Sequence, residues 1–372
     1  MKFSCEKYLL LNAIATASRA AAVKSAVPSL EGLLIEASSI VKISGYDLKT
    51  GISTTLSADV LEPGSIVLNA RLFGDIVRRL PDDIVVISTD ERFMTQIKCG
   101  MSEFNIVGVS AEDYPELPSV DYQNSVYIAQ SELKAMIAQT NFAVSDNEAR
   151  PIHTGSLFDI EDGVMTIVSV DGYRLALRRE RVNEKTEMNQ GSFVVPGSAL
   201  SEVEKIAADS DDLIKITLGT KHIVFVIGDT VLISRRLEGE FLNYKNSVPK
   251  TSKYTVLAER KALVDAIERV SLIISDKIKS PVRCTFSDDL LKIYTSTSLG
   301  RASDECAVNG TAEDMEIGFN NKYILDALKA APSENLKILL TSSVSPCIIT
   351  PADDSSSFLY MILPVRLKAN EN

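Results

Sequence analysis

The sequence predicts an α+β fold made of three similar modules, and an internal repeat is the observation that indicates it most strongly. Each module opens with a short strand-like run that leads into apolar residues at positions i, i+3 and i+4. That spacing places one apolar stripe on a helix. The first leucines of the stripes, Leu10, Leu133 and Leu263, lie 123 and 130 residues apart. So long a period indicates repeated whole domains rather than a solenoid of short repeats.

A second helical pattern follows in the later half of each module, at Ala70–Leu80, Gly197–Ala208 and Asn321–Ala331. Each is followed by a polar turn and another strand-like run. The rest of each module consists of short alternating segments that are broken by Gly, Pro and Asp turns. Many short antiparallel strands with two helices per module predict helices packed on one face of antiparallel sheets.

Proline and polar residues gather at two places that mark module boundaries, Tyr114–Pro118 and Val248–Ser252. The expected domains are therefore an N-terminal one at 1–120, a central one at 121–250 and a C-terminal one at 251–372. A chain of 372 residues is long enough for each domain to bury its own core.

Composition narrows the class of protein. With 45% hydrophobic and 24% charged residues, the chain is typical of a soluble globular protein. No apolar run reaches the roughly 18 residues of a membrane span, and the N-terminus lacks the features of a signal peptide. We therefore expect a cytoplasmic protein with no membrane partner. The 5 cysteines are scattered without a C-x-x-C spacing, which favours free thiols over disulfides or a zinc site.

Catalytic patterns are missing from the sequence. There are only 2 histidines, His153 and His222, and neither has the local context of a nucleophile–base site. Neither a phosphate-binding P-loop nor a dinucleotide-binding glycine motif occurs. Paired aspartates such as Asp82-Asp83 occupy turns, where Asp is favoured for backbone reasons. The sequence thus predicts no catalytic residue, no metal and no cofactor, and it disfavours an enzyme.

Two segments differ from ordinary turns and strands. Asp171–Leu175 follows a predicted strand, and Leu359–Leu367 is apolar almost throughout although it contains Pro364. A turn and a last core strand would explain both. Since proline belongs at a strand edge, the same residues are also compatible with the lining of a groove.

The whole chain, residues 1–367, resembles the bacterial sliding clamp family, the beta subunit of DNA polymerase III. Six segments carry the resemblance through their order and spacing. They are Met1–Phe3, Val170–Ala176, Glu240–Pro249, Met315–Asn320, Tyr323–Asp326 and Pro364–Leu367.

The resemblance implies a homodimeric ring of six similar domains, with twelve helices around a central hole and sheets on the outer rim. Such a ring encircles double-stranded DNA without sequence specificity and confers processivity on the replicative polymerase. A net charge of −11 argues against a protein that coats DNA. A ring is retained by topology, so that its DNA contacts can be few and its outer surface acidic. The expected DNA-facing residues are Lys24, Arg71, Arg78, Arg79, Arg150, Lys205, Lys277, Lys279 and Lys329.

The resemblance also implies a groove between the second and third modules that captures short linear motifs. Its partners would be the replicative polymerase subunit, the clamp loader, other polymerases and repair proteins. Tyr173, Leu242 and Asn246 replace residues common in the family, so the rim chemistry is expected to differ. The expected lining is His153, Val170, Gly172, Tyr173, Arg174, Leu175, Leu242, Val344, Pro346, Met361, Ile362, Leu363, Pro364, Val365 and Arg366.

Dimerisation would join module one of one chain to module three of the other. Phe104 and Ile106 would meet Ile273 and Ile274 across paired strand edges. Two alternatives stay open from the sequence: a hydrolase or transferase built on repeated domains, and a peptide-binding scaffold that does not form a ring.

Overall fold

The computed structural model describes residues 1–118, 124–275, 280–353, 355 and 357–367. Contacts divide the chain into two compact units, each with its own sheets and hydrophobic core. The first unit consists of Met1–Ser131, Asn183–Met188 and Glu202–Arg236, and the second of Glu132–Val182, Asn189–Ser201 and Leu237–Asn372.

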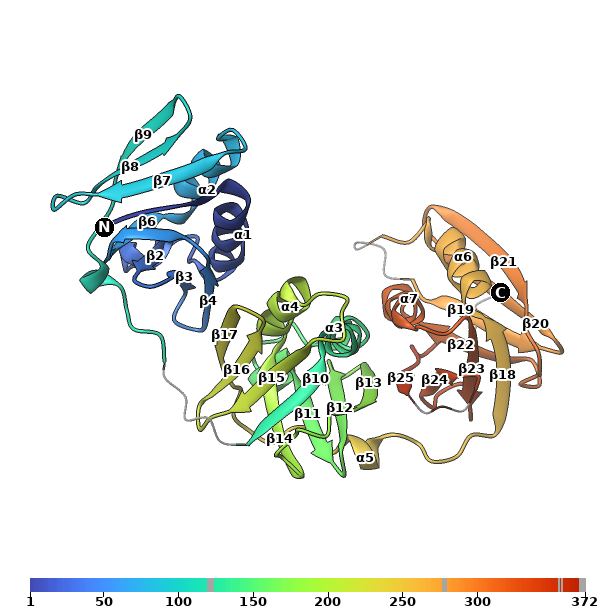
Figure 1. The fold of residues 1–372 in the computed structure, drawn as a ribbon. Coiled ribbons are helices and arrows are strands. Elements are labelled where there is room, and N and C mark those ends of the chain that lie inside the picture. The colour runs from blue at the N-terminus through green and yellow to red at the C-terminus, as the bar shows by residue number, and fades with distance from the viewer. Residues whose placement is uncertain (119–123, 276–279, 354, 356, 368–372) are drawn as a thin grey trace. The chain divides into compact units, whose positions relative to one another are not determined.

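Two antiparallel sheets and two helices build most of the first unit (Figure 1). The helices are α1 (Lys7–Ala17) and α2 (Ala70–Arg79). The five-stranded sheet has the order β5 (Asp59–Glu62), β1 (Lys2–Glu6), β7 (Ile84–Thr89), β8 (Met94–Cys99) and β9 (Ser102–Val107). The eight-stranded sheet has the order β10 (Ser125–Ala129), β15 (Leu213–Leu218), β16 (His222–Ile227), β17 (Thr230–Arg235), β4 (Thr50–Leu56), β3 (Val41–Tyr46), β2 (Gly32–Ala37) and β6 (Gly64–Asn69).

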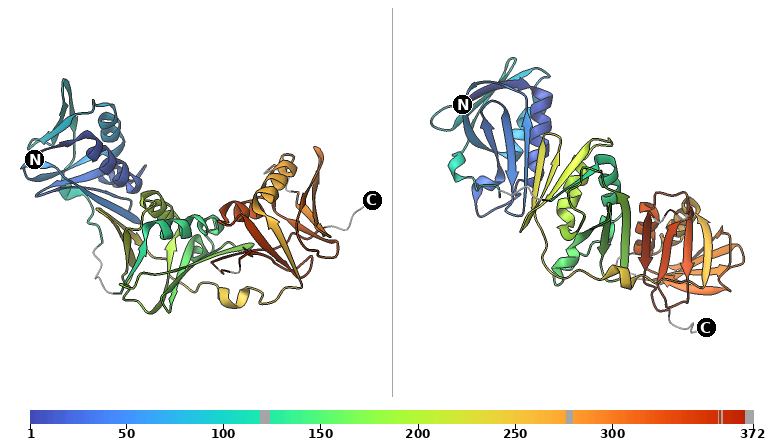
Figure 2. Two further views of the ribbon diagram at one scale, coloured as in Figure 1. Left: turned by 45° about the vertical axis from the view of Figure 1, so that its right-hand side comes forward. Right: turned by 60° about the horizontal axis from the view of Figure 1, so that its bottom comes forward.

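The second unit repeats this plan, again with antiparallel pairing (Figure 2). Its helices are α5 (Tyr244–Ser247), α6 (Arg260–Ser271) and α7 (Asn321–Ala330), while α3 (Gln130–Ala138) and α4 (Gly197–Ile206) begin in one unit and end in the other. The eight-stranded sheet has the order β14 (Gln190–Pro196), β11 (Gly155–Glu161), β12 (Val164–Val170), β13 (Arg174–Arg181), β25 (Phe358–Ile362), β24 (Cys347–Pro351), β23 (Asn335–Leu340) and β18 (Tyr254–Glu259). The four-stranded sheet has the order β21 (Gly300–Ala307), β20 (Leu290–Thr297), β19 (Val282–Ser287) and β22 (Met315–Phe319).

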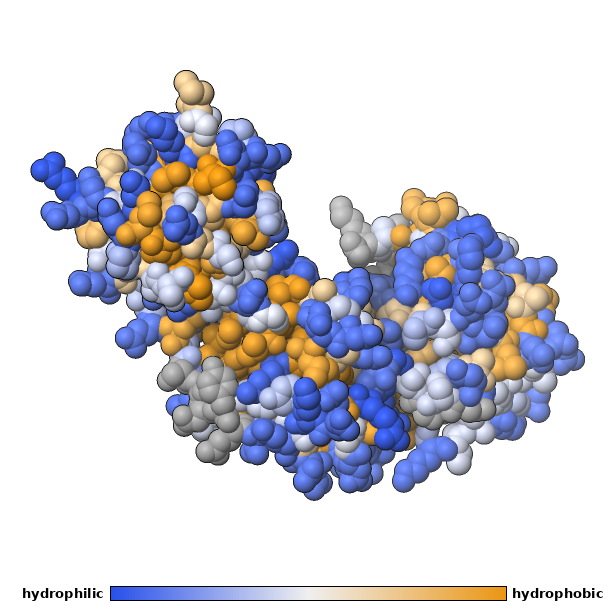
Figure 3. Space-filling view, in the orientation of Figure 1, coloured by the Kyte–Doolittle hydropathy of each residue, from blue (hydrophilic) through white to orange (hydrophobic). Residues whose placement is uncertain are grey.

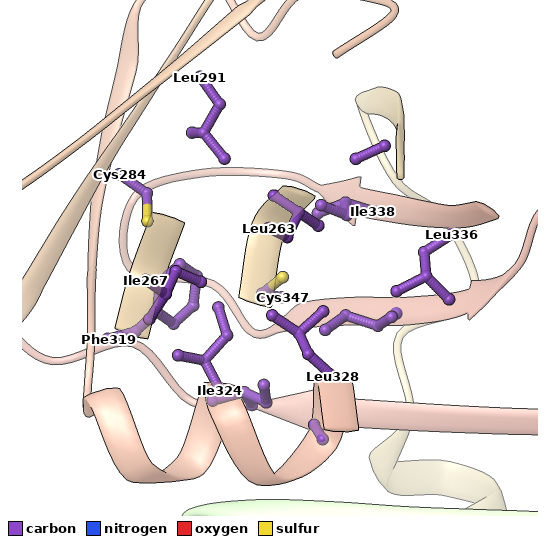
Figure 4. Close-up of a cluster of buried hydrophobic side chains, with 14 of the residues drawn as sticks. Leu263, Ile267, Cys284, Leu291, Phe319, Ile324, Leu328, Leu336, Ile338 and Cys347 are labelled. Carbon is purple, nitrogen blue, oxygen red and sulfur yellow. The ribbon is translucent and has the colours of Figure 1, made fainter. Parts of the chain in front are cut away.

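The repeated helical stripes form the cores, as predicted. Leu10 is fully buried in the core of the first unit, and Leu263 is 2% exposed in that of the second. Figure 4 shows Leu263 and Ile267 of α6 among side chains from α7 and the neighbouring strands. The second helix of each module, α2, α4 or α7, also lies within a residue or two of its predicted range. The α+β fold class and its three helix pairs are therefore confirmed.

Each eight-stranded sheet is made of strands from two neighbouring modules. In the first unit β17 pairs with β4, and in the second β13 pairs with β25. We call these contacts the first seam and the second seam. Because hydrogen bonds run across both seams, the sheets cross the predicted module boundaries at residues 120 and 250 without interruption. The boundaries themselves stay predictions.

Candidate functional site

The second seam begins at Arg174, whose guanidinium has three hydrogen-bonding partners. Its Nε donates to Asp171 Oδ2 at 2.9 Å, its Nη1 to Asp326 Oδ2 at 2.6 Å, and its Nη2 to the Phe142 carbonyl at 2.7 Å. The guanidinium carbon also lies 4.5 Å from the ring centroid of Tyr323, within the range of a cation–π contact. Since the side chain is only 7% exposed, these partners replace water and fix where β13 lies against α7.

A cavity of about 600 Å³ opens beside this arginine. It contains three residues of the predicted groove, Tyr173, Arg174 and Val365, together with Asn320 and Tyr323. The rings of Tyr173 and Tyr323 stack with centroids 5.9 Å apart and planes 23° from parallel. Asn320 caps α7 by accepting from the backbone N–H of Tyr323, which places that ring at the cavity. The cavity thus offers an aromatic surface with polar groups around it.

Other predicted groove residues form an apolar floor on the opposite face of the sheet. Val170, Leu175 and Met361 belong to one buried cluster. Phe241 and Tyr244, from the segment between β17 and β18, also contribute to it. Leu175 and Met361 are directly opposite each other in the register of β13 and β25. Adjacent residues on a strand point to opposite faces, so Arg174 and Leu175 serve the cavity and the floor respectively.

Ile362 requires a correction. Its side chain is fully buried in the core between the sheets and the helices α6 and α7, not in the cluster of Leu175 and Met361. The alternation of strand residues explains the difference, because Ile362 is one residue after Met361 and faces the other side. It therefore cannot line the floor that Leu175 and Met361 form.

His153 lies at the margin of the floor. Its ring makes an edge contact with Phe241, with centroids 5.5 Å apart and an interplanar angle of 78°. Burial, with a smaller contribution from Arg150, lowers the pKa of His153 below its usual value. The imidazole is therefore mainly neutral at pH 7 and acts there as an apolar and aromatic surface.

The remaining predicted groove residues, which we call the rim, are exposed or half-buried. Gly172 has φ = 93°, a conformation that its turn requires and that glycine adopts without strain. Val344 is 71% exposed, while Pro346 and Pro364 are half-buried. The exposed members of this rim are Gly172, Leu242, Val344, Leu363, Val365 and Arg366.

Four of the predicted DNA-facing side chains form ion pairs on their own helices or with a neighbouring one. Their distances are 2.7 Å for Arg78–Asp75, 3.8 Å for Arg79–Asp75, 2.7 Å for Lys205–Glu202 and 2.5 Å for Lys329–Glu268. Arg19, which the sequence analysis did not include, pairs with Glu202 at 3.2 Å. The helical part of this predicted surface is therefore more nearly neutral than its basic residues alone suggested.

The other predicted DNA-facing residues are in loops or at a helix start. Lys24, Arg71 and Arg150 are exposed. Lys277 and Lys279 lie outside the described residues. Helical spacing could have indicated the ion pairs, because Asp75 and Glu202 stand three residues before Arg78 and Lys205.

The predicted dimer contact involves two strand edges that are free and the segment that follows α6. Among the described strands β9 pairs only with β8, and β21 only with β20. On β9, Phe104 is 39% exposed, whereas Ile106 packs partly against the core of the first unit. Beyond α6, Ile274 packs partly against the core of the second unit, while Leu272 is 83% exposed. Figure 3 shows hydrophobic residues gathered in places among hydrophilic ones on one face of the molecule.

The residues that sequence reasoning missed are the partners of Arg174. Asp326, Tyr323 and Phe142 contact its guanidinium from segments remote in the chain. Tyr323 and Asp326 belong both to the predicted helix at Asn321–Ala331 and to a motif of the family. The helical pattern places Tyr323 near a helix start, but no local signal joins that helix to Arg174.

The parts of the chain that the structure describes hold no group of three or more His, Cys, Asp or Glu side chains suited to a metal ion. None of their helices is both long enough and apolar enough to cross a membrane.

Comparisons with known proteins identify the family. Models of the N-terminal, central and C-terminal domains of the DNA polymerase III beta subunit match residues 1–118, 127–243 and 245–366. The beta sliding clamp of Halalkalibacterium halodurans is 32% identical over 380 residues, covering 98% of this chain and 100% of that protein. The beta sliding clamp of Staphylococcus epidermidis is 32% identical over 377 residues, with 98% and 99% covered.

Solved structures agree. A putative DNA polymerase III beta subunit from Eubacterium rectale superposes with a TM-score of 0.93 at 33% identity, and the Bacillus subtilis sliding clamp with 0.94 at 29%. A sliding clamp from Pseudomonas aeruginosa, solved bound to griselimycin, superposes with a TM-score of 0.93 at 27% sequence identity. Each comparison covers 99% of this chain and 100% of the other. On these grounds the chain belongs to the family of DNA polymerase III beta subunits, the beta sliding clamps.

Proposed function

We propose that this chain is a DNA sliding clamp, which encircles duplex DNA as a homodimeric ring and tethers the replicative polymerase to it. The observation that carries the proposal is the pair of seams. They join three similar modules edge to edge, while β9 of the first module and β21 of the third each keep one edge free among the described strands. Two such chains can close on each other through these edges. The family is a non-catalytic processivity factor, and we expect no catalysis from this chain.

The ion pairs of the helices suit a clamp that slides. A DNA phosphate would have to compete with Asp75, Glu202 or Glu268 for the basic side chains. Surface ion pairs of this kind contribute only about 0–1 kcal/mol each. A phosphate can therefore replace the carboxylate easily, but the replacement adds little binding free energy. Weak phosphate contacts let the ring move, because each step breaks few strong interactions. Retention on DNA would then come from closure of the ring.

Retention by topology can be tested on a nicked circular DNA. The protein, loaded by a clamp loader from a related bacterium, should stay on the circle in about 1 M salt, where the Debye length is about 3 Å. Cutting the circle once should release it, because a ring slides off a linear end. Gel filtration of labelled protein with the DNA, before and after the cut, gives the result. Release by salt from the uncut circle would contradict the proposal.

We further propose that the floor of Val170, Leu175 and Met361, with its rim, binds short peptides from polymerases, the clamp loader and repair proteins. Each apolar side chain that a peptide buries there contributes roughly 1.5–3 kcal/mol. Association costs leave affinities on the order of micromolar, which suits a platform that exchanges partners.

Met361→Ala should weaken the binding of a fluorescent, leucine-containing clamp-binding peptide roughly tenfold or more, since about 1.4 kcal/mol of lost contact corresponds to tenfold. Fluorescence anisotropy measures the change. Met94→Ala removes a similar side chain from β8 in the first unit and serves as the control, with unchanged peptide affinity. Equal affinity of the Met361→Ala protein and the natural chain would rule out this floor as the binding surface.

A further inference from the structure

The turns before β4 and β13 have the same design. Asp47 Oδ1 accepts hydrogen bonds from the backbone N–H groups two and three residues later, at 2.9 and 2.7 Å. Asp171 Oδ1 does the same at 2.8 and 3.0 Å. Each turn leads into the strand that forms its seam, so positions counted from the two aspartates can be compared directly.

The equivalent positions differ in one informative way. Four residues after Asp171, Leu175 lies opposite Met361 and forms the apolar floor of the second seam. Four residues after Asp47 is Gly51, which lies opposite Ile233 in the first seam. The first seam therefore has the same strand geometry but lacks the leucine side chain of the floor.

A leucine from elsewhere in the chain takes that place. A Cβ atom built on Gly51 would lie 2.9 Å from Cδ2 of Leu117 and 3.0 Å from Cγ2 of Ile233. Leu117 belongs to the segment Tyr114–Pro118, which follows the first module, and is only partly buried. Tyr114 anchors that segment, since its ring is buried and its hydroxyl donates to the Ser44 carbonyl at 3.4 Å. The segment thus lies on the first seam as an extended peptide would.

Space remains beside this segment. A cavity lies between the segment and the sheet of the first seam. Its volume of about 520 Å³ is in the range of ligand-binding sites. The charged pair Glu36–Lys42, 2.8 Å apart, and Glu116 of the segment border it. The apolar residues of the sheet that line this cavity are Leu34, Val224, Val231 and Ile233.

We propose that the first seam is a second docking groove, for extended peptides that carry a leucine beside a proline, and that Leu117 of the chain itself is its resident occupant. A partner peptide binds by displacing Leu117 from its place above Gly51, while Tyr114 keeps the segment attached. This second groove does not require that the protein encircles DNA. It rests on the proposed function in one respect, namely that partners bind as short peptides with apolar side chains.

The test uses the full chain with isotope-labelled isoleucine methyl groups, in NMR titrations with a synthetic peptide that copies residues 112–118. In the variant Leu117→Ser the peptide should shift the Ile233 methyl signal saturably. Its affinity should be at least about fivefold higher than for the natural chain, because an occupied site reduces the apparent affinity by its free fraction. The same peptide with serine in place of leucine should leave Ile233 unchanged.

Ile348, which lies in the floor cluster of the second seam, reports independently on the other groove. A shift at Ile233, with or without one at Ile348, supports a second groove. Shifts confined to Ile348, or none at Ile233 at millimolar peptide, would overturn it. If Leu117→Ser perturbs the whole spectrum, the natural chain at millimolar peptide decides by the same signal. Loss of DNA retention or of the Ile348 response would concern the proposed function alone.

Discussion

Replacing Arg174 by methionine should lower the melting temperature of the second unit by roughly 6–20 °C, since loss of a buried ion-pair partner costs about 3–5 kcal/mol. The substitution leaves the carboxylates of Asp171 and Asp326 and the Phe142 carbonyl without their donor. It also removes the cation–π contact with Tyr323. Thermal unfolding followed by circular dichroism, with hydrogen exchange to locate the change at β13 and α7, measures the effect.

Arg269→Met is the matched control, because Arg269 pairs with Asp304 in the same unit but is 58% exposed. An exposed pair contributes about 0–1 kcal/mol, so the melting temperature should fall by no more than a few degrees. Arg174→Lys should recover only part of the loss, since one ammonium group cannot reproduce the three directed contacts of the guanidinium. Similar melting temperatures for Arg174→Met and Arg269→Met would show that the Arg174 contacts add little to stability.

The helices and their order could be predicted because each stripe of the repeat is buried as a unit. Leu10, Leu133 and Leu263 keep the same spacing to the next apolar residues, and such periodicity needs no knowledge of distant segments. Strands at the sheet edges have a weaker hydrophobic pattern in the sequence than the helices do. β21 alternates between exposed and half-buried residues, and its inward positions are small, as at Ala302 and Cys306. An edge strand of this kind resembles a polar loop in the sequence.

The partners within the candidate site could not be predicted, because they depend on contacts between remote segments. Arg174 and Asp326 are 152 residues apart in the chain, and no local pattern joins them. Alternation along β25 distinguishes Met361 from Ile362 only once the face that meets the helices is known. Leu117 was part of a proline-rich boundary in the sequence, and its position over Gly51 became visible only in the folded chain.

The second large effect concerns the proposed dimer, which Leu272→Asp should convert into a folded monomer. Leu272 is 83% exposed, so that aspartate there costs the free chain little. Ile274 packs partly against the core, and a charge at that position would disturb the fold as well as an interface. A closed dimer contains the contact twice, and each buried leucine contributes roughly 1.5–3 kcal/mol. The dimer dissociation constant should therefore rise roughly 100- to 10,000-fold, at about 1.4 kcal/mol per tenfold.

Sedimentation velocity at micromolar concentration distinguishes a chain of 40.6 kDa from its dimer. Leu61→Asp is the control, because Leu61 is 58% exposed on β5, the opposite edge of the sheet that ends in β9. That edge is short and already carries Asp59 and Glu62, which disfavour strand pairing between chains. The opposite edge of the β21 sheet is also occupied, since Gly318 of β22 forms a bridge with Val365. A dimer that survives Leu272→Asp but not Leu61→Asp would place closure at β5 instead of at β9 and the end of α6.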